Sequence, residues 1–284
     1  MGKNVKLIVI FWYSTRHHTA AMAKSDSSIG RAEKVTIAVE GNIGSGKTTL
    51  LKYLKDTDQA HVVDEPVEKW RHVTPGADGN LMELMYKNPM RYAYLFQSYV
   101  LLTMMEAHEE EHISNGPYKV MERSVYSARY CFIENLRKMT PPLINELEYA
   151  VSTQWFDYLI KHRRPQVDLI VYIRTSPAIC LSRLQKRNHS EEVGVSLAYL
   201  QSLHELHEDW LIHNTTQHGG NVPVLVLNGN TDSADYEKIP IEFCEAIADK
   251  IMQIQSATIS PSSCLPDPSA MAGVTSNASL QVLH

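Results

Sequence analysis

Hydrophobic and polar residues follow two different patterns along the chain between Val35 and Ile254. Five short runs are largely apolar and rich in β-branched side chains, which is typical of strands buried on both faces. They span residues 34–40, 61–66, 118–123, 168–174 and 223–229. Longer stretches with apolar residues three and four positions apart lie between them and predict helices. The alternation therefore predicts an α/β fold, with a five-stranded parallel sheet covered by helices on both faces.

Helices are expected wherever the longer stretches occur. They span residues 48–56, 81–88, 89–112, 124–138, 141–162, 176–187, 196–213 and 236–254. Proline suits the first helical turn, so Pro141-Pro142 and Pro177 mark two of the starts. The stretch after Pro66 is expected to form a loop. The sequence HELHE at 204–208 lacks the H-E-x-x-H spacing of zinc enzymes, and we interpret it as a charged helix face.

The two ends of the chain lack this alternation. Residues 1–34 are basic, with no acidic side chain before Asp26. Three interpretations stay open: a mitochondrial presequence, a weak signal-like stretch, or an upstream extension ahead of a start at Met22. Residues 255–284 are rich in Ser, Ala and Pro, which predicts a disordered tail. The expected folded domain is residues 35–254.

Composition narrows the class of protein. Hydrophobic residues make up 44% of 284 positions, which is enough for a sizeable core. The net charge of −5, with acids and bases interspersed, argues against a surface that coats nucleic acid. No run of apolar residues is long enough to predict a membrane span. Four cysteines without a C-x-x-C pair are typical of a reducing compartment, so we expect a mitochondrial or cytoplasmic protein.

The segment EGNIGSGKTT lies between the first predicted strand and the first predicted helix. Its spacing matches the phosphate-binding loop G-x-x-x-x-G-K-[ST]. Glycines let backbone N–H groups turn toward an anion, and the helix N-terminus adds positive potential. We expect an exposed Lys47 to reach the phosphates of ATP and Thr48 to hold Mg²⁺. The residues expected to bind the nucleotide here are Gly41, Asn42, Ile43, Gly44, Ser45, Gly46, Lys47, Thr48 and Thr49.

Charged residues follow two other predicted strands. Glu65 comes after one, and Glu122 and Arg123 come after the other. Because the carboxyl ends of parallel strands meet at one edge of a sheet, these side chains can face the loop. One carboxylate there can bind Mg²⁺, and another can accept the proton of an attacking hydroxyl while Arg123 holds both in place.

Three cations lie at the end of the helix predicted over 176–187. Arg183, Lys186 and Arg187 can close over the transferring phosphate as a lid. The alternative interpretation is a solvated basic helix face.

Seven segments together resemble the deoxyribonucleoside kinases, above all the insect multisubstrate enzyme and the mitochondrial thymidine kinase branch. They are EGNIGSGKTT, EPVEKW, LMELMY, FQSYVLLTM, ERSVYSARYCF, RLQKR followed by SEE, and YLQSLHELHEDWL. The resemblance implies a P-loop NTPase-type doubly wound sheet with a lid segment. It also implies transfer of phosphate from ATP, with Mg²⁺, to the 5′-hydroxyl of a deoxyribonucleoside in nucleotide salvage. A homodimer and feedback inhibition by dTTP are further implications.

The resemblance also implies roles for single residues. Glu65 is the expected base for the 5′-hydroxyl, with Arg123 on the 5′ oxygen and Glu122 beside Mg²⁺. Tyr86 and Glu192 are expected to bind the 3′-hydroxyl. The residues expected around the nucleobase are Trp70, Met85, Phe96, Gln97, Val100, Met104, Ala128 and Phe132. Among them, Gln97 would make paired hydrogen bonds to the base and Phe132 would stack on it.

Two positions bear on the choice of base, and one departs from the family pattern. The deoxycytidine and deoxyguanosine kinase branches carry Arg and Asp where this chain has Met104 and Ala128. With Val100, these uncharged residues favour thymidine and deoxycytidine over purines. His189 stands where the family lid usually has another Arg, which predicts weaker or pH-dependent lid electrostatics.

Three other functions compete with this interpretation. A nucleoside monophosphate kinase would need further arginines for the acceptor phosphate. A regulatory GTPase commonly uses an N-K-x-D segment, which the sequence lacks. A nucleotide-binding protein without catalysis stays open, although the presence of Lys47, Glu65, Glu122 and Arg123 together disfavours it.

Overall fold

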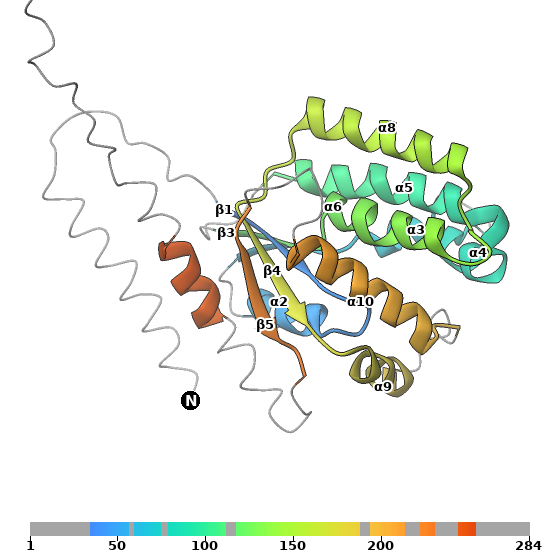
Figure 1. The fold of residues 1–284 in the computed structure, drawn as a ribbon. Coiled ribbons are helices and arrows are strands. Elements are labelled where there is room, and N and C mark those ends of the chain that lie inside the picture. Colours follow the sequence, from blue (N-terminus) through green and yellow to red (C-terminus); the bar gives the residue numbers. More distant parts are fainter. Residues whose placement is uncertain are drawn as a thin grey trace, which may run out of the picture.

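Five parallel strands form the centre of the molecule (Figure 1). The computed structural model describes residues 35–56, 60–74, 79–111, 118–187, 194–213, 222–230 and 244–253. The strands are β1 (Val35–Glu40), β2 (Ala60–Val63), β3 (Tyr118–Glu122), β4 (Leu169–Arg174) and β5 (Val224–Asn228). Their order across the sheet is β2-β3-β1-β4-β5, and every neighbouring pair is parallel. The predicted α/β fold with a five-stranded parallel sheet is confirmed.

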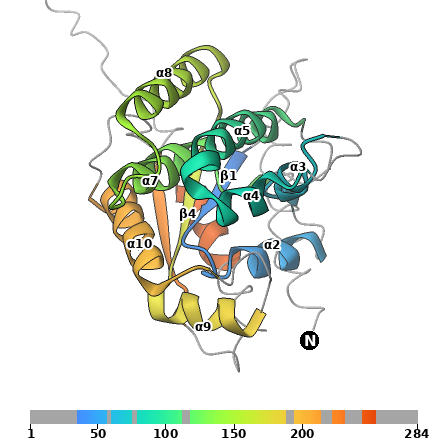
Figure 2. The same ribbon diagram turned by 90° about the vertical axis from the view of Figure 1, so that its right-hand side faces the viewer.

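Helices surround this sheet and build a second layer beside it. They are α2 (Lys47–Asp56), α3 (Val67–Arg71), α4 (Leu81–Lys87), α5 (Pro89–Glu109), α6 (Val125–Ser127), α7 (Glu134–Lys138), α8 (Glu146–Arg163), α9 (Pro177–Arg187) and α10 (Leu197–Leu211). Residues 244–253 are also helical. Figure 2 shows α2 and α10 on opposite sides of the strands, with α5 and α8 stacked above them. Among the described residues, no helix is both long and apolar enough to cross a membrane.

Side chains of β1 and β4 pack in alternation on the two faces of the sheet. Ile37 and Val39 belong to one core cluster, together with Leu50 of α2 and Ile251 of the last helix. Ala38, by contrast, belongs to a cluster on the other face together with apolar residues of α10. Successive residues of a strand point to opposite faces. Burial on both sides therefore explains why the strands carry nearly continuous apolar runs.

Three helix boundaries differ from the sequence prediction. The expected loop after Pro66 contains α3, whose Trp70 is buried. The stretch 124–138 is not one regular helix, because the π-helical segment η1 (Ala128–Ile133) separates α6 from α7. Pro141 and Pro142 precede α8 rather than opening it. Asn145 caps that helix, since its side chain accepts hydrogen bonds from the first-turn N–H groups.

The interpretation of HELHE as a charged face is wrong for His207. This side chain is fully buried, and its ring stacks on Tyr172 with 6.0 Å between centroids. Its neighbour Glu208 accepts from the Tyr172 hydroxyl and pairs with Arg174. The segment therefore fastens α10 to β4.

Several sequence predictions lie outside the described residues. They concern the extension at 1–34, the tail at 255–284, His189 and Glu192.

Candidate active site

The loop that joins β1 to α2 turns sharply at Gly41. This residue has a φ of 145°, and a Cβ there would lie 2.7 Å from the Ile173 carbonyl oxygen. Gly44, with a φ of 76°, would bring a Cβ to 2.8 Å from the carbonyl oxygen of Cys180. Both positions therefore require glycine for conformation and for space.

Lys47 begins α2 and turns back into the loop. Its Nζ donates to the carbonyl oxygens of Gly41 at 3.1 Å and Asn42 at 2.8 Å. The residue is only 4% exposed, so the expectation of an exposed Lys47 is wrong. Burial, assisted by the nearby Arg123 charge, lowers the pKa of Lys47 to about 8. The ammonium remains mostly charged at neutral pH and is fixed against the inner side of the loop.

Other side chains hold the loop from its outer side. The Asn42 amide donates to the Leu200 carbonyl at 2.7 Å, which fastens the loop to α10. The Thr175 hydroxyl donates to the Ser45 carbonyl at 3.1 Å. Arg183 of α9 donates to the same carbonyl at 3.0 Å and to that of Gly229 at 2.9 Å. Arg183 thus lies beside the loop, bonded to backbone, and its predicted action on the phosphate remains a prediction.

Thr48 and Glu122 come together at the mouth of the loop. The Thr48 hydroxyl donates to Glu122 Oε1 at 2.9 Å, across 74 residues of sequence. Hydroxyl and carboxylate oxygens are the hard ligands that Mg²⁺ takes, with waters and phosphates completing its shell. These two residues fit the predicted metal role.

Arg123 follows β3 in a strained conformation. Its φ is 64°, a left-handed value that costs a non-glycine residue about 1–2 kcal/mol. Its N–H donates to the Val39 carbonyl at 3.0 Å. Its guanidinium donates through Nη1 to the Gly41 carbonyl at 2.7 Å, and its Nε lies 3.0 Å from Glu65 Oε1. Gly41 therefore receives both Lys47 and Arg123 on one carbonyl oxygen.

The environment of Glu65 suits a proton acceptor. Burial raises the pKa of this carboxyl, while the Arg123 charge opposes the rise and Glu122 adds to it. The side chain keeps 21% of its surface exposed, so it is reachable from the cavity that it lines. A pKa moved toward neutrality strengthens a carboxylate as a general base at physiological pH.

One cavity of about 1030 Å³ extends from the loop to the helical layer. It brings together most of the predicted site. The predicted residues that line it are Ile43, Gly44, Gly46, Lys47, Thr48, Thr49, Glu65, Trp70, Met85, Tyr86, Phe96, Gln97, Val100, Glu122, Arg123, Phe132, Arg183 and Arg187. Met104 and Ala128 do not line the cavity and are buried in the core cluster to which Val100 also belongs. Gly41, Asn42 and Ser45 are buried within the loop itself.

The inner end of the cavity combines aromatic surfaces with one amide. Trp70 and Phe96 meet edge to face with 5.5 Å between centroids, and Trp70 is anchored by a 2.9 Å hydrogen bond to Thr103. Phe132 lies under the Arg123 guanidinium at 4.8 Å. Gln97 is 2% exposed, and its buried Oε1 has no hydrogen-bond partner among the described residues. A buried acceptor in this state calls for a donor from a ligand.

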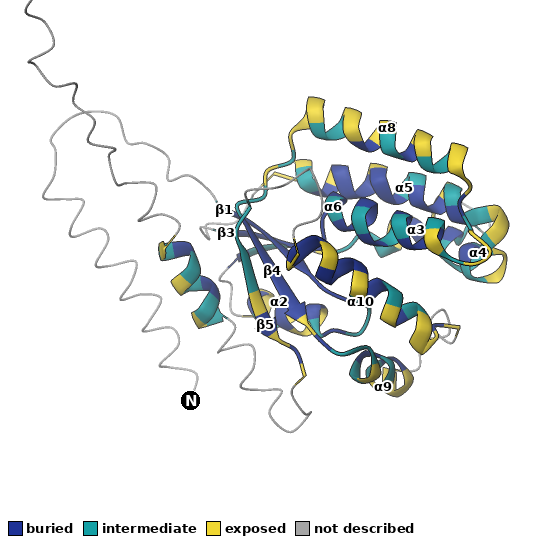
Figure 3. Cartoon of the chain, in the orientation of Figure 1, coloured by how far each residue is buried: buried dark blue, intermediate teal, exposed yellow. Residues whose placement is uncertain are grey.

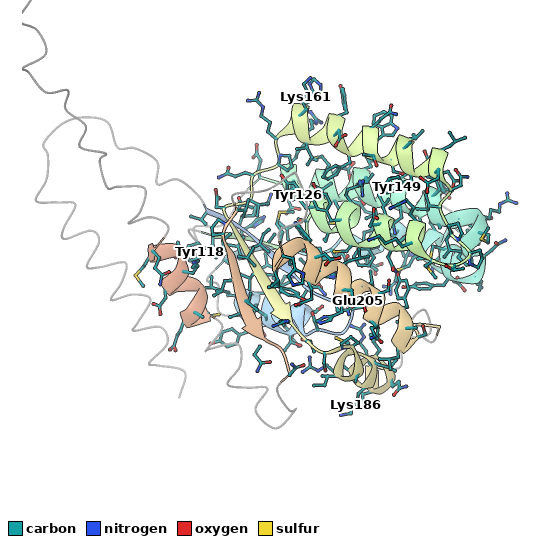
Figure 4. The ribbon with its side chains drawn as sticks, viewed as in Figure 1. Tyr118, Tyr126, Tyr149, Lys161, Lys186 and Glu205 are labelled. Atoms are coloured by element: carbon teal, nitrogen blue, oxygen red, sulfur yellow. The ribbon has the colours of Figure 1, made fainter. Side chains whose placement is uncertain are left out.

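Sequence reasoning missed several lining residues. Met82 lines the cavity, although the family resemblance implies only Met85 and Met104 among the methionines around the nucleobase. Tyr199 of α10 also lines it, and burial raises the pKa of its hydroxyl to about 12. Its segment contributed to the family resemblance without a role for this residue. Lys186 at the end of α9, by contrast, was predicted as part of the lid, and it does line the cavity (Figure 4).

Comparison with known proteins agrees with this geometry. The sequence profile described as deoxynucleoside kinase matches residues 37–252. "Thymidine kinase 2, mitochondrial" from Homo sapiens is 40% identical over 205 residues, covering 72% of this chain and 74% of that protein. "Deoxycytidine kinase 2" from Gallus gallus is 37% identical over 235 residues, covering 73% and 86%. "Deoxycytidine kinase" from Homo sapiens is 34% identical over 230 residues, covering 72% and 87%.

Proposed function

The chain belongs to the deoxynucleoside kinase family, and from this premise we propose how its site works. It is an enzyme that phosphorylates deoxynucleosides for salvage. We propose that ATP with Mg²⁺ is the phosphate donor and that pyrimidine deoxynucleosides are the preferred acceptors. The observation that carries the proposal is the Glu65–Arg123 ion pair, held within reach of the phosphate-binding loop in one cavity.

On the acceptor side, Glu65 takes the proton of the 5′-hydroxyl as phosphate is transferred. Arg123 holds the Glu65 carboxylate through Nε and is itself fixed to the Gly41 carbonyl through Nη1. The pair therefore presents a carboxylate oxygen in one orientation, and a positioned base commonly contributes about 10²–10⁴-fold to a rate.

On the donor side, backbone N–H groups of the loop and the N-terminus of α2 bind the ATP phosphates. Lys47 contributes a positive charge at a fixed place. Thr48 and Glu122 would hold Mg²⁺, which supplies charge neutralisation on the phosphate oxygens when bound.

At the inner end, Gln97 and the aromatic residues select the base. An amide offers one donor and one acceptor, which matches the edge of either pyrimidine. Val100 contributes an apolar wall, and Met104 and Ala128 belong to the same buried core cluster as Val100. One methyl group in an apolar pocket is worth about 1 kcal/mol, so thymidine and deoxycytidine should differ little. Tyr86 lines the same cavity and is proposed, with Glu192, to bind the 3′-hydroxyl.

A substrate panel tests the proposal. The full chain is incubated with ATP and thymidine, deoxycytidine, deoxyguanosine or dTMP, and ADP release is followed by a coupled assay. GTP alone is tested for hydrolysis in parallel. We expect rapid turnover with the two pyrimidine nucleosides and slower turnover with deoxyguanosine. A preference for dTMP, or GTP hydrolysis without an acceptor, would contradict the assignment.

A second copy of the chain is the proposed partner. Helix α8 carries a stripe of large, exposed apolar side chains at intervals of four, four and three residues. Figure 3 shows exposed positions along the outer face of this helix. They are Leu147, Val151, Trp155 and Tyr158, which are 80, 41, 59 and 55% exposed. Such intervals put side chains on one helix face, and apolar patches of this kind mark interaction sites. The opposite face of α8 buries Phe156 against the rest of the helical layer.

Regulation and location complete the proposal. dTTP would inhibit by occupying the nucleoside end and the loop end of the cavity together, which predicts competition with both thymidine and ATP.

Residues 35–254 are proposed to suffice for catalysis. Residues 1–34 would be dispensable for it, serving either mitochondrial import or no targeting role in a cytoplasmic enzyme. A fluorescent reporter fused to residues 1–34 separates these two cases.

A further inference from the structure

Glu40 ends β1 and takes no part in the chemistry described above. It is fully buried, although it immediately precedes the phosphate-binding loop. Its Oε1 accepts a 2.5 Å hydrogen bond from the Ser124 hydroxyl. Its Oε2 is buried and has no hydrogen-bond partner among the described residues. A buried carboxyl of this kind is expensive to keep, so its short hydrogen bond to Ser124 calls for a reason.

Ser124 is the residue that follows the strained Arg123. Besides the bond to Glu40, the Ser124 carbonyl accepts from the Ser127 hydroxyl at 3.0 Å. The Ser124 N–H donates weakly to the same hydroxyl, at 3.5 Å. Ser124 is thus fixed by its side chain on one side and by its backbone on the other. A left-handed non-glycine residue persists only when its surroundings hold it in place. Arg123 is held by its own bonds to Val39 and Gly41, and the fixed position of the next residue, Ser124, adds to them.

The strand register explains why Glu40 can reach this point. Val39 of β1 is level with Glu122 of β3, so the next residues, Glu40 and Arg123, lie side by side, although Glu40 still pairs with Tyr172 of β4. The Arg123 N–H donates a hydrogen bond to the Val39 carbonyl, which keeps the ends of β1 and β3 together. A side chain of glutamate length then spans from β1 to Ser124.

We propose that Glu40 is a positioning residue, which holds Arg123 in its left-handed conformation by anchoring Ser124. In that conformation the guanidinium meets Glu65 and the Gly41 carbonyl at the same time. The proposal rests on the roles given above to Arg123 and Glu65, and it adds a third carboxyl that acts on the reaction only through them.

What the anchor needs is an acceptor oxygen at the right reach rather than a negative charge. Burial raises the pKa of Glu40 to about 7, against the lowering influence of Ser124, Arg123, Ser127 and Lys47. A neutral side chain of the same length should therefore replace it well. A shorter side chain with the charge retained should not, because its oxygen would fall short of Ser124.

Three substitutions in the full chain separate reach from charge. Glu40→Gln keeps the reach and removes the charge, and Glu40→Asp does the reverse. Ser124→Ala removes the hydroxyl that donates to Glu40 and that also belongs to the capping box of α6. The matched control is Glu205→Asp, the same chemical change at an exposed position of α10 (Figure 4). For each protein, kcat and KM for thymidine are measured, together with the pH dependence of kcat/KM and the melting temperature.

We expect Glu40→Asp and Ser124→Ala to lower kcat by about 10- to 100-fold, with KM within about threefold, because a catalytic group is displaced. In these two variants, the acidic limb of the pH profile, where kcat/KM rises with pH, should move to higher pH. The reason is that Arg123 lowers the pKa of Glu65, and a displaced Arg123 lowers it less. Glu40→Gln should recover most of the kcat and restore the limb. Reduced stability alone would change the melting temperature but not the position of that limb. Ser124→Ala, the smallest change, carries the test if Glu40→Asp does not fold.

Wild-type kcat and an unmoved limb in both Glu40→Asp and Ser124→Ala would overturn the inference. So would a Glu40→Gln variant as impaired as Glu40→Asp. Glu65→Gln and Arg123→Lys are assayed alongside to separate the two levels of the proposal. If these two keep full activity, the proposed mechanism itself fails. If they lose activity while the Glu40 and Ser124 variants behave as wild type, only the positioning role fails.

Discussion

Replacing Glu65 by glutamine tests the proposed base most directly. The amide keeps the shape of the side chain but cannot take a proton. Loss of a general base costs about 10²–10⁴-fold, which corresponds to about 3–5 kcal/mol in the activation free energy. Glu65 lines the cavity beside Arg123 rather than the nucleobase, so thymidine should still bind with a dissociation constant near that of the wild type.

The fold should tolerate this change. Breaking a fully buried ion pair costs about 3–5 kcal/mol. The Glu65 side chain is 21% exposed, and the amide oxygen of glutamine can still face Arg123, so a loss of about 1–2 kcal/mol is expected instead. Arg123 also keeps its bond to Gly41. The variant should therefore melt cooperatively, a few degrees below the wild type.

The pH profile gives the assay its resolving power. Glu65 acts as a base only when ionised, so wild-type kcat/KM should rise as pH increases through its pKa. Burial raises that pKa above the ordinary 4.5, which puts the acidic limb above that pH. In Glu65→Gln this limb should vanish along with most of the rate. Glu83→Gln serves as the control, because this side chain of α4 is 45% exposed and does not line the cavity. A Glu65→Gln enzyme within threefold of wild-type kcat, or one that keeps the limb, would refute the assignment.

Four further outcomes are expected. Lys47→Ala should abolish measurable ATP use while leaving the fold cooperative by circular dichroism; normal turnover would exclude the loop as the donor site. Met104→Arg combined with Ala128→Asp should shift kcat/KM from thymidine toward purines, and an unchanged ranking of the four natural deoxynucleosides would contradict this. Trp155→Glu should convert a dimer to a monomer in light scattering, while a wild type that is already monomeric would remove the proposed interface. Glu40 holds its proton more tightly in the folded state than in the unfolded state, so its contribution to stability falls as pH rises from about 4.5 to 7. Glu40→Gln should therefore gain stability relative to wild type between pH 5 and pH 8, by up to about 3 kcal/mol in denaturant titrations.

The strands and the loop could be predicted from sequence because their signals are local. A strand buried on both faces must be apolar throughout, as β4 is, and a tight anion-binding turn must have glycine where Gly41 stands. The strand ends then brought Glu65 and Arg123 together, because parallel strands share one carboxyl edge. Those features needed no knowledge of distant contacts.

The features that sequence did not predict depend on tertiary contacts. Lys47 is buried because its ammonium turns back onto two loop carbonyls, a conformation that no spacing encodes. The π-helical turn at Ala128–Ile133 adds one residue to a helix turn, which leaves the apolar pattern nearly unchanged. For α8, a good capping residue at Asn145 outweighed the prolines upstream. Tyr199 reaches the cavity only because α10 crosses beside the loop, where Asn42 bonds to Leu200.

The carbonyl oxygen of Gly41 is a common anchor for Lys47 and Arg123, the residues proposed to act on the phosphate donor and on the nucleoside acceptor. Lys47 donates to it beside the proposed phosphate site, and Arg123 donates to it beside Glu65, the proposed base. In the proposed mechanism, the spacing of the two reacting groups is thereby set within the loop and the sheet, and not by the helices that carry Met85, Phe96 and Gln97. Substitutions in those helices can change which nucleoside enters without altering the distance across which phosphate moves. Substrate range can thus be altered by mutation in this scaffold, while the geometry of phosphoryl transfer is kept.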